Sequence, residues 1–144
     1  MLLGTINEHF SVASLLPKIN ATPQLTIDTG EIRRINSAGV RSWIGFLGAL
    51  PPSVQITYER LPVVMVEQAN MVLNFLGHGA VRSFLAPYFC YECQESQHHL
   101  IETTSGLFDR SDPKPPPLQC RKCGGGLDFD DDESAFFAFL ENLA

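Results

Sequence analysis

The sequence predicts an α/β protein with a small, mostly parallel four-stranded sheet and flanking helices, followed by a four-cysteine ribbon and a terminal helix. In the first part of the chain, short apolar runs alternate with longer segments whose apolar residues recur at helical spacing. This alternation is typical of strands that are joined by helices around a parallel sheet. All four cysteines lie beyond residue 89, in two C-x2-C pairs, which predicts a second module there.

Two strands and two helices are expected before the adjacent prolines Pro51 and Pro52. Residues 2–6 are a brief apolar segment and are expected to form the first strand. Asn7 offers a cap for a helix that Pro17 should end, and residues 25–28 form an apolar second strand after a turn. Apolar residues recur along one face of residues 37–50, so we expect a helix that stops at the prolines.

Two more strands and one more helix complete the expected sheet. Residues 54–58 alternate between apolar and polar side chains, as a strand with one exposed face does. Residues 63–76 again show helical spacing, and Gly77 is a suitable residue to end that helix. Residues 81–85 give the fourth strand. The short connections favour parallel strands with right-handed crossovers, and the apolar residues of the helices are interpreted as core.

The turn before residues 37–50 carries two residues that cap helices well, Asn36 and Ser37. Ser37 is therefore expected between a strand and a helix, over the positive end of the helix dipole. Its hydroxyl is expected to be exposed, and a phosphate added there would meet free backbone N–H groups. Local chemistry leaves two roles open for Ser37, a helix cap alone or a modification site.

Residues 35–40, Ile-Asn-Ser-Ala-Gly-Val, resemble the Asp-Ser-x-Gly-Leu signature of STAS domains, the fold of bacterial anti-sigma factor antagonists. The order of elements over residues 1–89 is similar to that family, although STAS domains typically begin with one more strand. We therefore expect a truncated sheet with an exposed edge. The resemblance implies that Ser37 matches the phosphorylated serine and Gly39 the glycine of the signature, while Asn36 stands where the family usually has Asp.

The resemblance also implies a function, that of a non-enzymatic protein–protein interaction module in bacterial signalling. In STAS proteins that switch, the unphosphorylated form binds a kinase-like partner, here an anti-sigma factor or another signalling protein. The expected partner surface is the turn at Asn36 and Ser37. The arginines that flank this turn could meet an acidic partner or a phosphate, and a solvated surface position is the alternative for each of them. A constitutive adaptor or scaffold without a phosphoswitch is the alternative function. The flanking arginines are Arg33, Arg34 and Arg41.

The cysteines are spaced as metal ligands. Cys90 and Cys93 form one C-x2-C pair, and Cys120 and Cys123 form another after 26 intervening residues. Two such pairs can close a tetrahedral site of four thiolates, which suits structural Zn²⁺ and leaves no open position for catalysis. The arrangement resembles a zinc ribbon. Disulfides and a redox C-x2-C motif are the alternatives.

The segments between and after the cysteine pairs are polar. Residues 94–119 contain a proline-rich run and too few apolar residues for a core of their own, so metal binding is expected to supply folding energy there. His98 or His99 could replace a thiolate as an alternative ligand. Residues 128–133 resemble a calcium loop but lack glycine at its sixth position. We expect a solvated acidic run that caps a last helix at residues 134–143, whose apolar face is buried against the rest of the chain or a partner.

Charge is unevenly distributed along the chain, which has a net charge of −6. Residues 1–89 hold six Lys or Arg and five Asp or Glu, for a net charge of +1, whereas residues 90–144 hold four and eleven, for −7. The change coincides with the first cysteine and predicts two modules with these same boundaries. Because the second module is acidic, nucleic-acid binding is not expected, and a nucleic-acid-binding zinc ribbon is a weaker alternative.

Catalytic and membrane signals are missing from the sequence. It carries no P-loop, dinucleotide-binding fingerprint, H-E-x-x-H or G-x-S-x-G motif, and we expect no enzyme. It has no run of about 20 apolar residues that could span a membrane. Its first residues lack the basic flank and long apolar core of a signal peptide. We therefore expect a cytoplasmic protein that does not contact a membrane.

Overall fold

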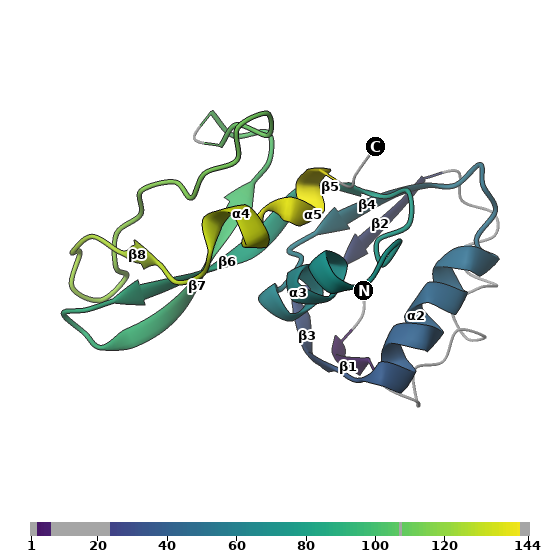
Figure 1. The fold of residues 1–144 in the computed structure, drawn as a ribbon, viewed down its shortest axis with the longest axis horizontal. Helices are drawn as coiled ribbons and strands as arrows, with labels where there is room; N and C mark the ends of the chain where they lie inside the picture. Colours follow the sequence, from purple (N-terminus) through teal and green to yellow (C-terminus); the bar gives the residue numbers. More distant parts are fainter. Residues whose placement is uncertain (1–2, 7–23, 107, 142–144) are drawn as a thin grey trace.

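The computed structural model describes residues 3–6, 24–106 and 108–141. Figure 1 shows two parts, small parallel sheets accompanied by two main helices and a long antiparallel ribbon that extends away from them. None of the helices in the described ranges is long and apolar enough to cross a membrane. The helices are α2 (Ser37–Ala49), α3 (Val63–Met71), α4 (Glu133–Phe136) and α5 (Ala138–Glu141).

Parallel strands form two small sheets instead of the single four-stranded sheet that the sequence predicts. β2 (Gln24–Asp28), β4 (Gln55–Glu59) and β5 (Ala80–Val81) pair in the order β2-β4-β5. β1 (Leu3–Ile6) pairs in parallel with β3 (Glu31–Ile35), a strand that the sequence analysis missed. Two adjacent arginines make β3 polar, so a search for apolar runs passes over it.

The prediction of a mostly parallel sheet is wrong because the strand expected at residues 81–85 contributes to two sheets. β5 ends at Val81, and β6 (Ser83–Cys90) then pairs antiparallel with both β7 (Glu95–Glu102) and β8 (Asp128–Phe129). Every second side chain of β6, beginning with Phe84, is buried. This buried face continues past Pro87 to the first cysteine, so the strand is longer than its apolar start indicates.

β6 also joins the ribbon to the parallel sheet. Leu61, just after β4, forms an isolated parallel bridge with Phe84. The Leu61 N–H donates to Ser83 O at 3.1 Å, and Leu61 O accepts from the Leu85 N–H at 2.8 Å. Residue 89 lies inside β6, and the division of the chain into modules at residues 1–89 and 90–144 stays a prediction.

The helices follow the sequence pattern with two adjustments. α2 is the helix expected at residues 37–50, whereas α3 ends at Met71 and not at residue 76. The chain becomes extended at Val72 and then turns, which buries Phe75 and Leu76 in the core. The helix expected after Asn7 lies outside the described residues.

The core has two aromatic groups. Around α2, Trp43 and Tyr58 are fully buried, and their polar atoms donate to Phe75 O at 2.8 Å and Leu76 O at 3.0 Å. Between the ribbon and the C-terminal helices, Phe84 contacts four other phenylalanine rings at centroid distances of 5.3–6.3 Å. The predicted last helix is divided into α4 and α5, and its apolar face is buried within the chain as far as the structure describes it. The rings around Phe84 belong to Phe108, Phe136, Phe137 and Phe139.

Candidate metal centre

Two tight turns bring the four cysteines together at the tip of the ribbon. Cys90 is the last residue of β6, and Cys93 lies in the turn that leads into β7. Cys120 and Cys123 lie in a second turn, which an antiparallel bridge between Gln119 and Gly126 closes. Two turns from distant parts of the sequence thus face each other, as the spacing of the cysteines predicts.

The sulfur positions have the dimensions of a tetrahedral metal site. Cys90 Sγ lies 3.6 Å from Cys123 Sγ, Cys93 Sγ lies 3.8 Å from Cys120 Sγ, and all four sulfurs lie within 4.8 Å of one another. A regular tetrahedron with metal–sulfur distances of about 2.3 Å has sulfur–sulfur edges of about 3.8 Å. The four cysteines, all in the described part of the chain, are free thiols without a disulfide. They can therefore hold a metal ion.

Backbone N–H groups point at the sulfurs in both turns. Cys93 N donates to Cys90 Sγ, and Gly125 N donates to Cys123 Sγ, each at 3.4 Å. The chain enters the left-handed region just after each pair, with φ of +55° at Gln94 and +73° at Gly124. Glycine adopts this conformation at little cost, whereas glutamine is strained there. The two turns thus share a left-handed residue after the second cysteine, although the sequence marks only the second turn with a glycine.

The thiols have unequal acidity. Backbone N–H groups of Cys123 and Lys122 lower the pKa of the Cys120 thiol to about 6. In contrast, hydrogen bonding with the Cys123 thiol raises the pKa of Cys93 to about 12. A bound divalent cation would favour the thiolate form of all four cysteines, because thiols that coordinate a metal are deprotonated.

Gln97 extends the site beyond the cysteines. Its Nε2 donates to Cys120 Sγ at 3.1 Å, and its Oε1 accepts from His99 Nε2 at 2.9 Å. Burial lowers the pKa of His99, which favours the neutral ring that makes this bond. The histidine alternatives to a thiolate ligand are not supported, since His98 and His99 do not belong to the ligand cluster. Nothing in the sequence singled out Gln97, because its spacing from the cysteines carries no motif.

Two charged side chains connect the second turn to β7. Lys122 Nζ lies 2.6 Å from Glu95 Oε1, and Arg121 Nη2 donates to His98 O at 2.8 Å. The hydrogen bond that Lys122 donates to Glu95 raises the pKa of Lys122, which stays cationic beside the cysteines. These contacts hold the second cysteine turn against β7.

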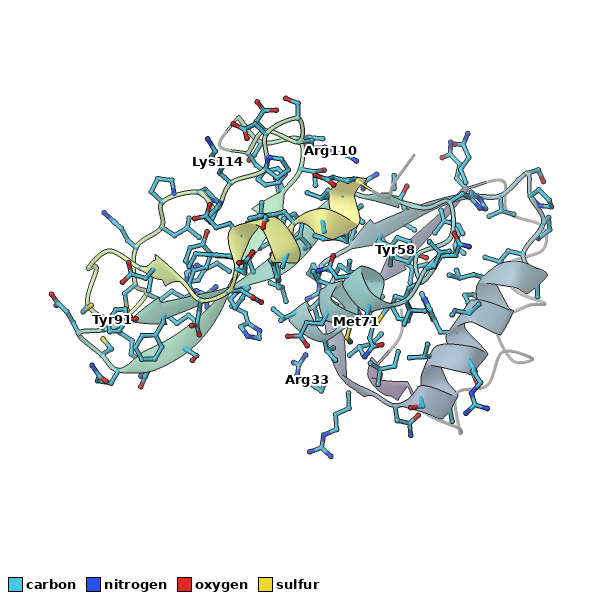
Figure 2. The ribbon with its side chains drawn as sticks, in the orientation of Figure 1. Arg33, Tyr58, Met71, Tyr91, Arg110 and Lys114 are labelled. Atoms are coloured by element: carbon cyan, nitrogen blue, oxygen red, sulfur yellow. The ribbon has the colours of Figure 1, made fainter. Side chains whose placement is uncertain are left out.

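The second predicted site, at Ser37, lies far from the cysteines. Figure 1 shows α2 and the ribbon tip at opposite ends of the molecule, and Figure 2 shows Tyr91, beside the first cysteine turn, well away from Arg33. Asn36 is the N-cap of α2, and its Oδ1 accepts from the Gly39 N–H at 2.7 Å. Ser37 is the first residue of α2 and is exposed, while Gly39 is buried. The expected exposure of Ser37 is confirmed.

The arginines that flank this turn are exposed. Arg34 and Arg41 lie on β3 and α2, and Arg33 uses its Nη1 to donate to Gly30 O at 3.0 Å. The turn that precedes β3 is fixed by Asp28, whose carboxylate accepts from the Gly30 N–H at 3.0 Å and from the guanidinium of Arg60 at 2.7–3.1 Å. This contact positions β3 and hence the start of α2.

The acidic run at residues 128–133 ends in a helix cap. Asp132 is the N-cap of α4, and its Oδ1 accepts from the Ala135 N–H at 2.9 Å. Backbone and side-chain donors lower the pKa of Asp132, beginning with the Ala135 N–H. The prediction that this run caps the last helix is confirmed.

Comparisons with protein-family models, curated proteins and solved structures find no match to this chain. The function must therefore be inferred from the geometry of the two sites and from the sequence motifs.

Proposed function

We propose that this chain is a non-enzymatic protein-interaction module of STAS type in bacterial signalling, with a ribbon held by a structural zinc ion. The observation that carries the proposal is the turn between β3 and α2, where Asn36 caps the helix and Ser37 is exposed at its first position. A partner or a kinase can reach a side chain in this position without unfolding the helix.

Zinc is the metal that suits the four thiolates best. Thiolates in a closed tetrahedral set favour Zn²⁺ over Mg²⁺ or Ca²⁺, which prefer oxygen ligands. The sulfur separations of 3.6 and 3.8 Å fit a Zn–S distance of about 2.3 Å. Four protein ligands fill the tetrahedral coordination shell, so the proposed role is structural.

The proposed zinc ion would help to order a segment that has no regular secondary structure in its described part. Between β7 and the second cysteine turn, the described residues of the segment 103–118 form turns and loops without a helix or strand. Phe108 and Leu118 pack against the hydrophobic core from this segment. Metal binding contributes about 10 kcal/mol or more of folding free energy in zinc-finger peptides, which would offset the entropy of ordering such a loop.

Phosphorylation of Ser37 is the proposed switch. A phosphate would bring between one and two negative charges to the N-terminal end of α2, where helix dipoles favour anions. The exposed flanking arginines could pair with it and thereby change the charge of the partner surface. We expect the unphosphorylated form to bind a kinase-like anti-sigma factor or another signalling protein, and the phosphorylated form to release it.

Affinity purification tests this proposal. Tagged wild-type protein is compared with Ser37→Ala and Ser37→Asp, and the bound proteins are identified by mass spectrometry. We expect Ser37→Asp to lose a partner that Ser37→Ala retains, while Ser53→Asp, a change at another exposed serine, has no effect. Equal capture by all variants would contradict the switch and favour a constitutive adaptor.

A further inference from the structure

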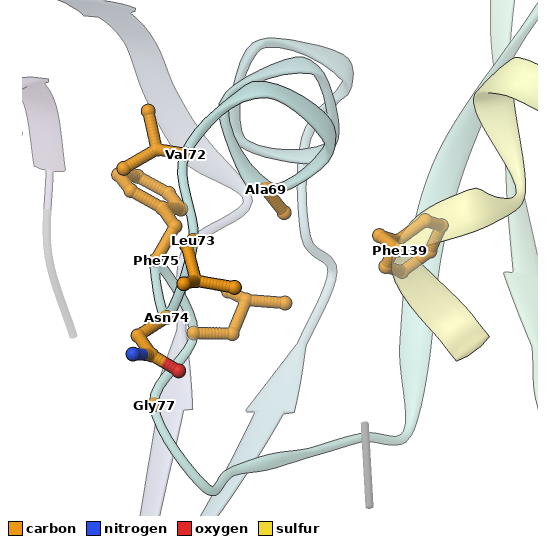
Figure 3. A pocket seen from close by; sticks show the side chains of 8 residues that line it. Ala69, Val72, Leu73, Asn74, Phe75, Gly77 and Phe139 are labelled. Carbon is orange, nitrogen blue, oxygen red and sulfur yellow. The ribbon is translucent and has the colours of Figure 1, made fainter. Parts of the chain in front are cut away.

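The contact between α3 and the C-terminal helices leaves two hollows at the surface. Asn70 on α3 donates through Nδ2 to Phe136 O on α4 at 3.0 Å, which ties the helices together. One hollow, of about 270 Å³, lies between α3 and α4 and includes Met71 in its lining. The other, of about 110 Å³, lies between the segment after α3 and Phe139 of α5, and Figure 3 shows Leu73 facing it. We call these two hollows with Met71 and Leu73 the α3 groove.

The α3 groove carries the two most exposed large apolar side chains in the described part of the chain. Met71 and Leu73 are 71% and 81% exposed, whereas the other large apolar residues that are exposed in the described part of the chain are Tyr91 at 65% and Leu100 at 44%. Single exposed apolar residues are common on protein surfaces. Two of them, two positions apart and next to hollows, are typical of a surface that another molecule covers.

The charge of the α3 groove indicates the kind of partner. Glu67 and Asp131 line the larger hollow. The two segments that form the groove, residues 61–81 and 123–144, contain no Lys or Arg at all. The second of these segments also includes the acidic run at residues 128–133, whose carboxylates are exposed next to α4. Carboxylates beside the apolar lining of the larger hollow complement a cationic amphipathic partner.

We propose that the α3 groove binds a short cationic amphipathic segment of a partner protein. Apolar side chains of that segment contact Met71 and Leu73 and enter the hollows, and its Lys or Arg residues face Glu67 and Asp131. A second copy of this chain is disfavoured, because a two-fold interface would bring the carboxylates at the larger hollow of both copies together. The α3 groove is separate from both the cysteine cluster and the Ser37 turn, so this inference depends on neither the zinc ion nor phosphorylation.

Fluorescence anisotropy with synthetic peptides tests the inference on the full chain. The probe is a labelled peptide of about 12 residues with Leu on one helical face and Lys on the other. We expect micromolar binding that weakens with added salt. A peptide with the same Leu pattern and Glu in place of Lys, and a peptide with Lys and Ser only, should each bind about tenfold more weakly or worse. No binding of the Lys–Leu peptide below about 1 mM, or equal binding of the Glu–Leu peptide, would overturn the inference.

Surface variants locate the binding site. Leu73→Ser and the double change Glu67→Lys with Asp131→Lys should each weaken binding of the Lys–Leu peptide by about tenfold. Two changes outside the groove serve as controls, Leu100→Ser for the exposed apolar residue and the double change Glu102→Lys with Asp112→Lys for the two charge reversals. Thermal melting confirms that each variant is folded, as the exposure of these side chains predicts. Equal losses in the control variants would place the binding elsewhere and overturn the inference.

Light scattering after size exclusion distinguishes a second copy from a foreign partner. At about 100 μM protein we expect a monomer, since the proposed occupant is not this chain. A dimer that dissociates on the Leu73→Ser change would show that a second copy covers the groove, and would overturn the inference.

Discussion

Replacing Gln97 by alanine tests whether contacts beyond the cysteines set the affinity for zinc. The change removes a hydrogen bond of 3.1 Å to Cys120 Sγ and, with it, the contact to His99. Loss of such an outer contact typically lowers metal affinity by about 10- to 100-fold. Cys120 keeps the Lys122 backbone N–H as a donor at 3.4 Å, so we expect the lower end, a loss of about tenfold.

Competition with a chromogenic zinc chelator measures this loss. Ser96→Ala is the matched control, because Ser96 is the exposed neighbour of Gln97 on β7. The Co²⁺-substituted forms of Gln97→Ala and wild-type protein should both show a tetrahedral thiolate spectrum, which separates weakened affinity from a lost ligand. If Gln97→Ala binds zinc as tightly as wild type, the proposed role of this hydrogen bond is wrong.

Three further predictions concern stability, each measured by urea unfolding. Phe84→Ala should lower the free energy of unfolding by about 3–5 kcal/mol, because it removes the ring at the centre of the second aromatic group. Asn36→Ala should cost about 1 kcal/mol through loss of the α2 cap. Asp28→Asn should destabilise the protein near neutral pH but much less in acid. The hydrogen bond from Arg60 lowers the pKa of Asp28 below 3.8, so its contribution is present above about pH 4 and is lost as the pH falls through the folded-state value.

Each of these predictions has a control and an opposing result. Tyr91→Ala removes an exposed ring and should cost far less than Phe84→Ala, so similar losses would contradict the assigned core. Asn36→Asp keeps a side-chain acceptor at the cap and should retain most of the stability. A loss in Asp28→Asn that is as large at pH 2 as at pH 7 would show that the carboxylate charge is not what stabilises this turn.

The start of α2 could be predicted from the sequence because its signals are local. Asn36 carries a capping side chain, and Trp43 and Leu47 then follow on the expected apolar face, which the helix buries. The C-x2-C pairs are equally local, since each tight turn is encoded by four consecutive residues. Their meeting in one cluster followed from the chemistry of metal ligands, which requires all the sulfurs around one ion.

The strand pairing could not be predicted in the same way, because it depends on contacts between distant residues. An apolar run at residues 81–85 is compatible with either a parallel or an antiparallel neighbour. Leu61 bonds to the backbone on both sides of Phe84, and this contact continues the parallel arrangement for one step along one edge of β6. β7 pairs antiparallel with β6 along the other edge, from Ser83 onward. Gln97 could not be predicted for a related reason, because its contact with Cys120 depends on where β7 places its side chain.

The central claim is that a metal ion held by four thiolates supports the ribbon. Native mass spectrometry of reduced protein, together with elemental analysis, measures this most directly. We predict a single zinc ion per chain. A strong chelator that removes the zinc should unfold the ribbon, seen as loss of its dispersed amide signals in NMR spectra, and added zinc should restore them. Fully reduced protein that contains no metal and still keeps the ribbon folded would contradict the claim.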